Sequence, residues 1–420
     1  MTLTRGSSLP VVVVGAGLAG LACARRLAAA GRPLVVLEAS DDVGGRVRTD
    51  EHAGFHLDRG FQVLLTAYPE ARALLDYGRL HLRPFYPGAL VRHAGRFHRI
   101  ADPFRRPLDA AAALLSPIGT VADKARVLGL RHRARAGTLH ELFRRPETSS
   151  MAALTALDFG NEIVERFFQP FLGGIFLGRE LSTSSRMLDF VIRMMADGDI
   201  ALPAAGMGAI ARQLAAGLPD GAIRVGSEVA AVTPGGVTLR DGRAVEAAAV
   251  VVATEGPTAA TLLGREPPRA WRSVTTLYFA APRPPVRGSY LVLDGDGAGP
   301  VNNLCVPSEV AESYAPPGRA LICASVLGLP ESSDAELLAA VLEQLGRWFG
   351  RETGEWTHLR TYRIRYALPD QSPPTAPPAT LPPMVAPGLY LAGDHQDTAS
   401  INGALASGRR AAEAILTAVP

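Results

Sequence analysis

The feature of the sequence that most constrains its fold is a glycine-rich turn between an apolar strand and a helix. Four valines, Val11 to Val14, are followed by the string GAGLAG and by an alanine-rich stretch of strong helix formers that reaches Ala30. A second apolar run, Leu34 to Leu37, follows at once and ends in Glu38. The pattern predicts a strand, a helix and a second, parallel strand with a right-handed crossover.

The residues of this turn are suited to hold a dinucleotide. Gly15 permits the tight turn, Gly17 permits close approach to a pyrophosphate, and Gly20 permits the helix to pack closely on the strand. Free N–H groups at the helix start attract the anion. Glu38, 18 residues beyond Gly20, is placed to bind an adenosine ribose and would repel a 2′-phosphate, so NADP is disfavoured. The cofactor-binding residues predicted here are Gly15, Ala16, Gly17, Leu18, Ala19, Gly20, Glu38 and Ala39.

The composition is that of a globular protein with two or three structural units, since 47% of the 420 residues are hydrophobic and 20% are charged. The net charge is +3 and the basic residues are scattered, which argues against nucleic acid as a partner. Three cysteines, Cys23, Cys305 and Cys323, fit neither a disulfide framework nor a metal site and favour a cytoplasmic location. No signal peptide or membrane span is expected. Peripheral membrane contact and the oligomeric state stay open.

A second motif, Gly44-Gly45-Arg46, comes shortly after Glu38. Its glycines permit close backbone approach, and its guanidinium can neutralise a diphosphate or brace the loop. This Gly-Gly-Arg motif is not part of an ordinary NAD site. The string from Val11 to Thr49 resembles the signature of the flavin-dependent superfamily that contains amine oxidases, protoporphyrinogen oxidases and phytoene desaturases. The resemblance implies FAD as the cofactor.

Later strings continue this resemblance along most of the chain. FHLDRGFQ, with Asp58, is similar to the segment beside the isoalloxazine, and FFQPFLGGIFLGRELS to part of the substrate region of protoporphyrinogen oxidases. GSEVAAV matches a segment whose valine contacts adenine, and in the C-terminal string LYLAGDHQDTASINGALASGRRAAEAI the carboxylate of Asp394 matches one that binds the ribityl chain. The further cofactor-binding residues implied are Gly44, Gly45, Arg46, Gly60, Phe61, Gln62, Val229, Ala253, Gly393, Asp394, Ser400 and Ile401.

The expected fold class is α/β, with a Rossmann-like FAD-binding domain of the GR2 type and an inserted α+β substrate-binding domain. The FAD-binding domain is expected over residues 8–67, 204–270 and 360–420, and the substrate domain over 68–203 and 271–359. The first insert has a mostly helical pattern. A terminal helix is expected to begin near Ile401, so its positive end can face the part of the flavin that gains negative charge on reduction.

Residues that differ from the monoamine-oxidase pattern restrict the reactions to be expected. Alignment of the strand SVTTLYF places Thr276 where those enzymes have lysine, and Ser400 where they have an aromatic residue. The resemblance therefore favours removal of a hydride from a carbon of a largely apolar small molecule, as in desaturases or protoporphyrinogen oxidases. An amine oxidase, an isomerase that uses reduced FAD, and a flavin-binding protein without turnover are the alternatives, and oxygen or a quinone is the expected electron acceptor.

Few catalytic side chains are expected, because hydride transfer to a flavin needs placement more than acid or base catalysis. The candidates for the flavin face are Gln62, Tyr366 and His395, each as an orienting group. The basic run Arg131, His132, Arg133 and Arg135 is interpreted as a solvated face. A second hypothesis is that arginines and aromatic residues of the inserted region form an apolar pocket with a basic mouth, suited to a hydrophobic acid.

Overall fold

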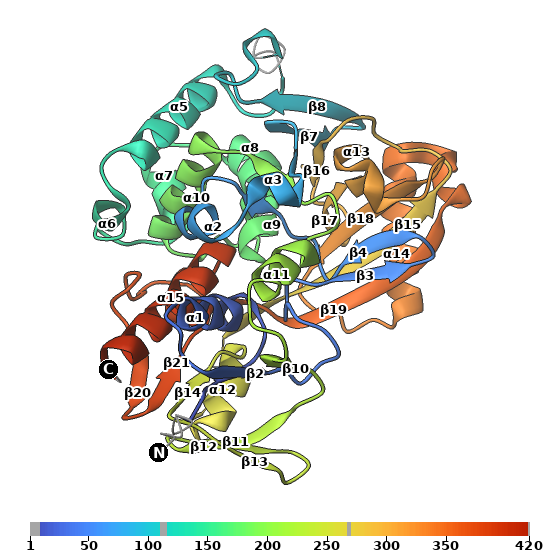
Figure 1. The fold of residues 1–420 in the computed structure, drawn as a ribbon. Helices are drawn as coiled ribbons and strands as arrows, with labels where there is room; N and C mark the ends of the chain where they lie inside the picture. The colour runs from blue at the N-terminus through green and yellow to red at the C-terminus, as the bar shows by residue number, and fades with distance from the viewer. Residues whose placement is uncertain (1–8, 110–115, 267–269, 419–420) are drawn as a thin grey trace, which may run out of the picture.

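A computed structural model describes residues 9–109, 116–266 and 270–418, and its α/β fold contains two large sheets (Figure 1). The first sheet has six strands in the order β10-β2-β1-β14-β21-β20. Its neighbouring strands are parallel except for the pair β20 and β21. The strands are β1 (Val11–Val14), β2 (Leu34–Leu37), β10 (Ile223–Arg224), β14 (Ala249–Val252), β20 (Met384–Ala386) and β21 (Leu389–Leu391).

Both faces of this sheet are covered, which explains why β1 and β14 are continuous apolar runs. Val12 and Val14 of β1 face a cluster that includes a small three-stranded sheet, whereas Val11 and Val13 face the helices on the other side. The predicted strand–helix–strand unit is confirmed, because β1 pairs in parallel with β2. The small sheet consists of β11 (Val229–Thr233), β12 (Gly236–Leu239) and β13 (Ala244–Glu246), and the nearby helices are α1 (Leu18–Ala29), α11 (Gly208–Ala215), α12 (Gly256–Leu262) and α15 (Ile401–Ala418).

The second sheet has seven strands in the order β19-β15-β18-β17-β16-β7-β8. Two of its strands, β7 and β8, come from the insert with the mostly helical pattern, where β7 pairs in parallel with the distant β16. The expected domain boundary at residue 360 falls inside β19. The strands are β7 (Gly88–His93), β8 (Arg96–Ala101), β15 (Trp271–Ala281), β16 (Leu291–Asp294), β17 (Val301–Cys305), β18 (Ala320–Leu327) and β19 (Thr357–Pro369).

Helices from the first insert lie at one end of the molecule, beside the second sheet (Figure 1). Ser184 caps helix α10, because its hydroxyl accepts a hydrogen bond from the N–H of Arg186. The helices are α2 (Pro69–Leu74), α3 (Tyr77–Leu80), α5 (Val121–Arg135), α6 (Leu139–Leu142), α7 (Ser150–Ala156), α8 (Asn161–Ile163), the π-helix η1 (Val164–Phe168), α9 (Gln169–Phe176) and α10 (Ser185–Asp197).

Shorter elements connect these layers. A two-stranded hairpin is formed by β3 and β4 and a small sheet by β5, β9 and β6, and helix α14 packs against the second large sheet. The strands are β3 (Thr49–His52), β4 (Phe55–Asp58), β5 (Leu64–Leu65), β6 (Arg83–Pro84) and β9 (Ile200–Leu202); the helical elements are α13 (Pro307–Val310), η2 (Glu312–Tyr314), α14 (Asp334–Phe349), η3 (Gly350–Glu355) and η4 (Asp394–Gln396). In the described ranges no helix has the length and apolar content needed to span a bilayer.

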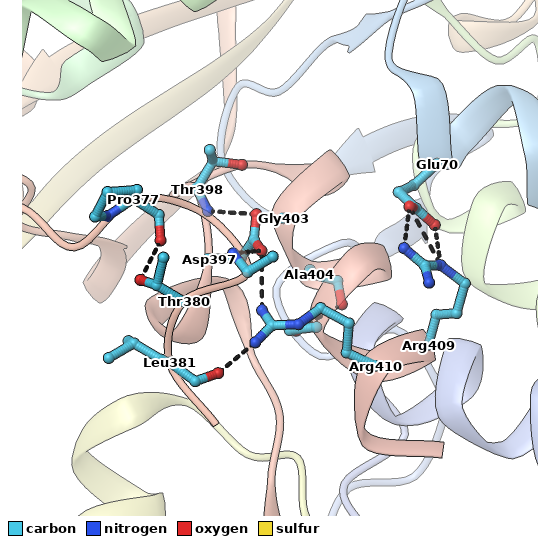
Figure 2. A network of polar contacts seen from close by, with 12 residues as sticks. Glu70, Pro377, Thr380, Leu381, Asp397, Thr398, Gly403, Ala404, Arg409 and Arg410 are labelled. Atoms are coloured by element: carbon cyan, nitrogen blue, oxygen red, sulfur yellow. Dashed lines mark hydrogen bonds and ion pairs between the residues drawn. The ribbon is translucent and has the colours of Figure 1, made fainter. Parts of the chain in front are cut away.

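The C-terminal helix α15 packs directly on α1, although the two are far apart in the sequence (Figure 1). A Cβ placed on Gly408 would lie 2.0 Å from the carbonyl oxygen of Ala19, so the helices approach backbone to backbone. On the other sides, Arg409 bridges to Glu70 of α2 at 2.7 Å and Arg410 to Asp397 at 3.2 Å. Figure 2 shows these two arginines reaching in different directions from the helix. These contacts hold the middle of α15 in a defined position.

We expect Gly408→Ala to destabilise the protein, because its methyl group would collide with the backbone of Ala19 and separate the two helices. Overpacking of this kind costs about 1–3 kcal/mol. Gly346→Ala in α14 is the matched control: the nearest atom to its new Cβ is 3.6 Å away, and replacing a helix glycine contributes about 1 kcal/mol of stability. Melting temperatures of the two variants would measure the difference, and equal values would contradict the close packing.

Candidate functional site

A cavity of about 720 Å³ is lined by residues of both large sheets. Val14 and Leu37 contribute from the first sheet, and Val274, Leu291 and Ile364 from the second. Motifs separated by nearly the whole chain meet at this cavity. The sequence-predicted residues that line it are Gly15, Gly17, Leu18, Ala19, Glu38, Ala39, Gly44, Gly45, Arg46, Gly60, Phe61, Gln62, Val229, Ala253, Gly393, Asp394, Ser400 and Ile401.

The glycine turn and the Gly44-Gly45-Arg46 step lie side by side at one wall. The N–H of Gly44 donates to the carbonyl of Ala16 at 2.8 Å, and a Cβ on Gly45 would lie 3.4 Å from the Cα of Gly17. A Cβ on Gly17 would meet no protein atom within 4 Å, so space for a ligand is open beside the start of α1. Gly20 does not line the cavity: a Cβ there would lie 2.0 Å from the Gly15 carbonyl, so this glycine shapes the turn.

Glu38 follows β2 and is fixed by backbone donors. Its Oε2 accepts from the N–H of Ala16 at 2.7 Å, and its Oε1 accepts from the N–H of Ser40 at 2.9 Å. Ala16 therefore lies behind the cavity wall, and its N–H orients the carboxylate of Glu38. The Ser40 hydroxyl also donates to Oε1, at 2.7 Å. A carboxylate has about four acceptor positions, so Glu38 keeps one for a ribose hydroxyl. Val229 lines the cavity next to Ser227 and Glu228, at the same end.

A bidentate ion pair joins the early motif to the C-terminal motif. Arg46 donates to both carboxylate oxygens of Asp394, at 2.9 and 2.6 Å, and also to the carbonyl of Ala367 at 2.9 Å. The side chain of Asp394 is 5% exposed and that of Arg46 is 28% exposed. This geometry favours a bracing role for Arg46. Asp394 is held at the cavity wall beside Ser400 and the start of α15.

These residues fit the FAD that the sequence implies. Glu38 and Val229 lie where an adenosine would be held, and the open space at Gly17 admits a diphosphate next to the N-terminus of α1. Asp394 and Ser400 line the cavity where α15 begins, and the positive end of that helix can stabilise negative charge. Both ends of an extended dinucleotide are therefore provided for in one cavity.

The three predicted flavin-face residues are placed differently. Gln62 lines the cavity, and its Nε2 donates to the carbonyls of Arg46 and Arg59 at 2.7 and 3.2 Å. Tyr366 does not line it and packs edge-on against Trp271, with ring centroids 5.9 Å apart. His395 does not line it either, since its ring turns back over Gly393. Burial lowers the pKa of His395, and neither ring nitrogen has a hydrogen-bond partner among the described residues, although Nδ1 lies 4.0 Å from Asp394 Oδ1.

The end of the cavity away from the glycine turn is largely apolar. Phe171 and Phe176 of the FFQPFLGGIF string contribute to it, as do Met187 and Val191 of α10. The polar lining residues that sequence reasoning missed include Tyr68, Tyr86 and Asn303. Burial raises the pKa of Tyr68. No sequence signal could have identified Asn303, because it comes from β17 of the second sheet.

Asp58 of the FHLDRGFQ string is buried away from the cavity. Its carboxylate accepts from Thr49 Oγ1 at 2.6 Å, from the N–H of Met207 at 2.9 Å and from the hydroxyl of Tyr314 at 2.8 Å. Desolvation raises its pKa to about 6 despite these bonds. Asp58 therefore connects β4 to neighbouring elements and holds the segment that leads to Gly60.

The hypothesis of a basic mouth formed by arginines of the inserted region is wrong for those of the run at 131–135. Arg131, Arg133 and Arg135 form ion pairs with acidic residues of the insert, and none of them lines the cavity. Thr276 is fully buried and also outside the lining. In the parts of the chain that the structure describes, no cluster of residues could hold a metal ion.

The family described as flavin containing amine oxidoreductase matches residues 18–416. A coproporphyrinogen III oxidase from Propionibacterium freudenreichii subsp. freudenreichii is 26% identical over 406 residues, which cover 80% of this chain and 76% of that protein. An oxidoreductase from Methanosarcina mazei has a TM-score of 0.70 at 19% identity, covering 97% of this chain and 100% of that one. Reduced UDP-galactopyranose mutase has a TM-score of 0.69 at 16% identity, covering 98% and 96%. The two structures share the fold, and the chain belongs to the flavin-containing amine oxidoreductase family as an FAD-dependent oxidoreductase.

Proposed function

We propose that this enzyme removes a hydride from a C–C or C–N single bond of a largely apolar small molecule, in the manner of a desaturase or a protoporphyrinogen oxidase. The observation that carries the proposal is the continuity of the cavity. Nucleotide-binding motifs line one part of it, and apolar side chains such as Phe171 and Met187 line another. A substrate bound among these apolar groups would lie next to the cofactor. Bound FAD supplies the hydride acceptor.

The side chains at the cavity are suited to hold and orient a substrate. Gln62 is anchored on two backbone carbonyls, so its position is fixed before any substrate binds. Tyr68 and Phe61 present aromatic surface to the cavity, and desolvation of the Tyr68 hydroxyl raises its pKa and keeps it protonated. Apolar walls also exclude water from the reacting carbon. Placement of the substrate is therefore the main contribution of this chain.

Two observations favour carbon oxidation over the monoamine route. Thr276 occupies the position that the family pattern assigns to lysine, and it lies outside the cavity lining. Lys124, the single lysine of the chain, lies in α5, where its Nζ donates to the carbonyl of Ser116 at 2.8 Å. The similarity to a coproporphyrinogen III oxidase supports the same reading. Oxygen or a quinone is the proposed electron acceptor.

We expect the FAD-loaded enzyme to lose its yellow colour under anaerobic conditions when its substrate is added, and to regain it when oxygen or a quinone is added. Coproporphyrinogen III is the first compound to test, followed by other apolar compounds with oxidisable C–C or C–N bonds. Absorbance of the bound flavin measures the result. Product formation without net bleaching would indicate an isomerase, and the absence of both across the series would contradict an oxidoreductase.

A further inference from the structure

Asn303 brings a carboxamide into the largely apolar end of the cavity. It is part of β17, and although it lines the cavity it is only 3% exposed. Its neighbours in the lining include Phe171, Ile175 and Leu291, which cannot hydrogen-bond to an amide. A polar side chain in such a place is costly unless it has a partner.

The orientation of this carboxamide is fixed by the preceding residue. Asn302 Nδ2 donates to the carbonyl of Pro170 at 2.8 Å and to Asn303 Oδ1 at 3.0 Å. A backbone carbonyl can only accept, so the atom of Asn302 that faces Pro170 must be the amide nitrogen. The same nitrogen then requires an acceptor on Asn303. Oδ1 of Asn303 is used in this way, and its Nδ2 donates to no atom of the described residues.

The surrounding structure maintains this arrangement at a cost. Oδ1 of Asn302 is buried and has no hydrogen-bond partner among the described residues. Apolar side chains at positions 302 and 303 would avoid this unpaired atom. Helix α9 also leaves room for the pair, because a Cβ on Gly174 would lie 2.9 Å from Asn303 Oδ1. A Cβ on the adjacent Gly173 would meet its nearest atoms at the ordinary distance of 3.5 Å. An unsatisfied buried polar group of this kind calls for a functional explanation.

We propose that the Nδ2 amide of Asn303 is a donor subsite for an oxygen of the substrate, either a carboxylate or a carbonyl oxygen. The substrate is then an apolar molecule that bears an acceptor oxygen, and neither a pure hydrocarbon nor an amine. This inference rests on the proposed function, because it assumes that the substrate occupies the apolar end of the cavity. An ammonium group offers only donors and would face the N–H groups of Asn303 without an acceptor.

The test uses three probes with the same phenylalkyl body: 4-phenylbutyrate, 4-phenyl-2-butanone and 4-phenylbutylamine. Their dissociation constants are measured by calorimetry on the FAD-loaded protein. The wild type should prefer the acid or the ketone to the amine, and the two oxygen probes distinguish a carboxylate from a carbonyl subsite. Asn303→Leu should weaken the preferred oxygen probe by about tenfold, which corresponds to the loss of one hydrogen bond. Asn303→Asp should reverse the order of affinities, so that the amine binds more tightly than the acid or the ketone.

Two glycine variants provide a matched pair that leaves Asn303 in place. Gly174→Ala should displace the carboxamide and weaken the oxygen probe, whereas Gly173→Ala should bind it like the wild type. A wild type that prefers the amine or binds all probes equally would overturn the subsite, as would an order unchanged in Asn303→Asp. So would equal effects of the two glycine variants. Failure to bind FAD would instead contradict the proposed function, so the two failures are distinguishable.

Discussion

Glu38→Arg should yield protein without bound FAD. In the folded chain the carboxylate of Glu38 accepts from the N–H groups of Ala16 and Ser40 and from the Ser40 hydroxyl, and its remaining acceptor position is available to a ribose hydroxyl. An arginine only donates, so it would face those N–H groups and the positive start of α1 with a like charge. A hydrogen bond to a charged group contributes about 1.5–3 kcal/mol, so its loss together with this repulsion would weaken FAD binding by about a hundredfold or more.

The flavin-to-protein absorbance ratio after gel filtration measures this result. Glu38→Gln is the conservative variant: it keeps the shape and one acceptor, and we expect intermediate retention of FAD. Glu51→Arg changes the charge equally but at an exposed position on β3, so it should purify yellow. A fully yellow Glu38→Arg protein would show that the adenosine end is not held at Glu38.

The fold was predictable where local pattern and tertiary role agree. The valines of β1, the glycine turn and the helix that follows are strong signals because each requires only its immediate neighbours in sequence, and the terminal helix from Ile401 was anticipated for the same reason. Strands β7 and β8 were not anticipated inside the insert. Their stability depends on β16, about 200 residues away, and no local pattern reports such a pairing.

The candidate site was predictable only in its nucleotide-binding part. Glycines and a carboxylate at fixed spacing have a direct chemical reason, and those residues do line the cavity or support its wall. Tyr366 and His395 do not line it, because the chain near them turns toward Trp271 and Gly393. Side-chain direction at such positions depends on packing that a sequence string does not contain.

The residues that would recognise the substrate also could not be predicted from the sequence. A hydrophobic acid was one hypothesis for the substrate, recognised by arginines of the inserted region, of which the run at 131–135 holds three. Those arginines are neutralised by Asp102, Asp189 and Asp197. If a substrate oxygen is recognised in the apolar end, the amide of Asn303 is an uncharged donor for it there. A neutral donor in an apolar wall avoids the cost of burying a cation before the substrate binds.

Arg46→Met should lower the melting temperature of the protein even when no FAD is bound. Asp394 is 5% exposed, and Arg46 donates to both of its oxygens. Removal of one partner from a buried ion pair leaves an unpaired charge and costs about 3–5 kcal/mol. For a chain of this size such a loss corresponds to a fall in melting temperature of roughly 3–6 °C. Thermal unfolding followed by circular dichroism, with and without FAD, measures the effect.

The size of the effect should follow the burial of the charge that is left behind. Asp394→Asn leaves the guanidinium, which is 28% exposed, so its loss of stability should be smaller than that of Arg46→Met. Replacing both partners by apolar residues should recover part of the loss, because no buried charge remains. Arg243→Met removes one partner of an exposed arginine–aspartate pair and should leave the melting temperature unchanged. If Arg46→Met lowered the melting temperature only of the FAD-loaded protein, its guanidinium would serve the diphosphate, and the bracing role inferred from the ion pair would be wrong.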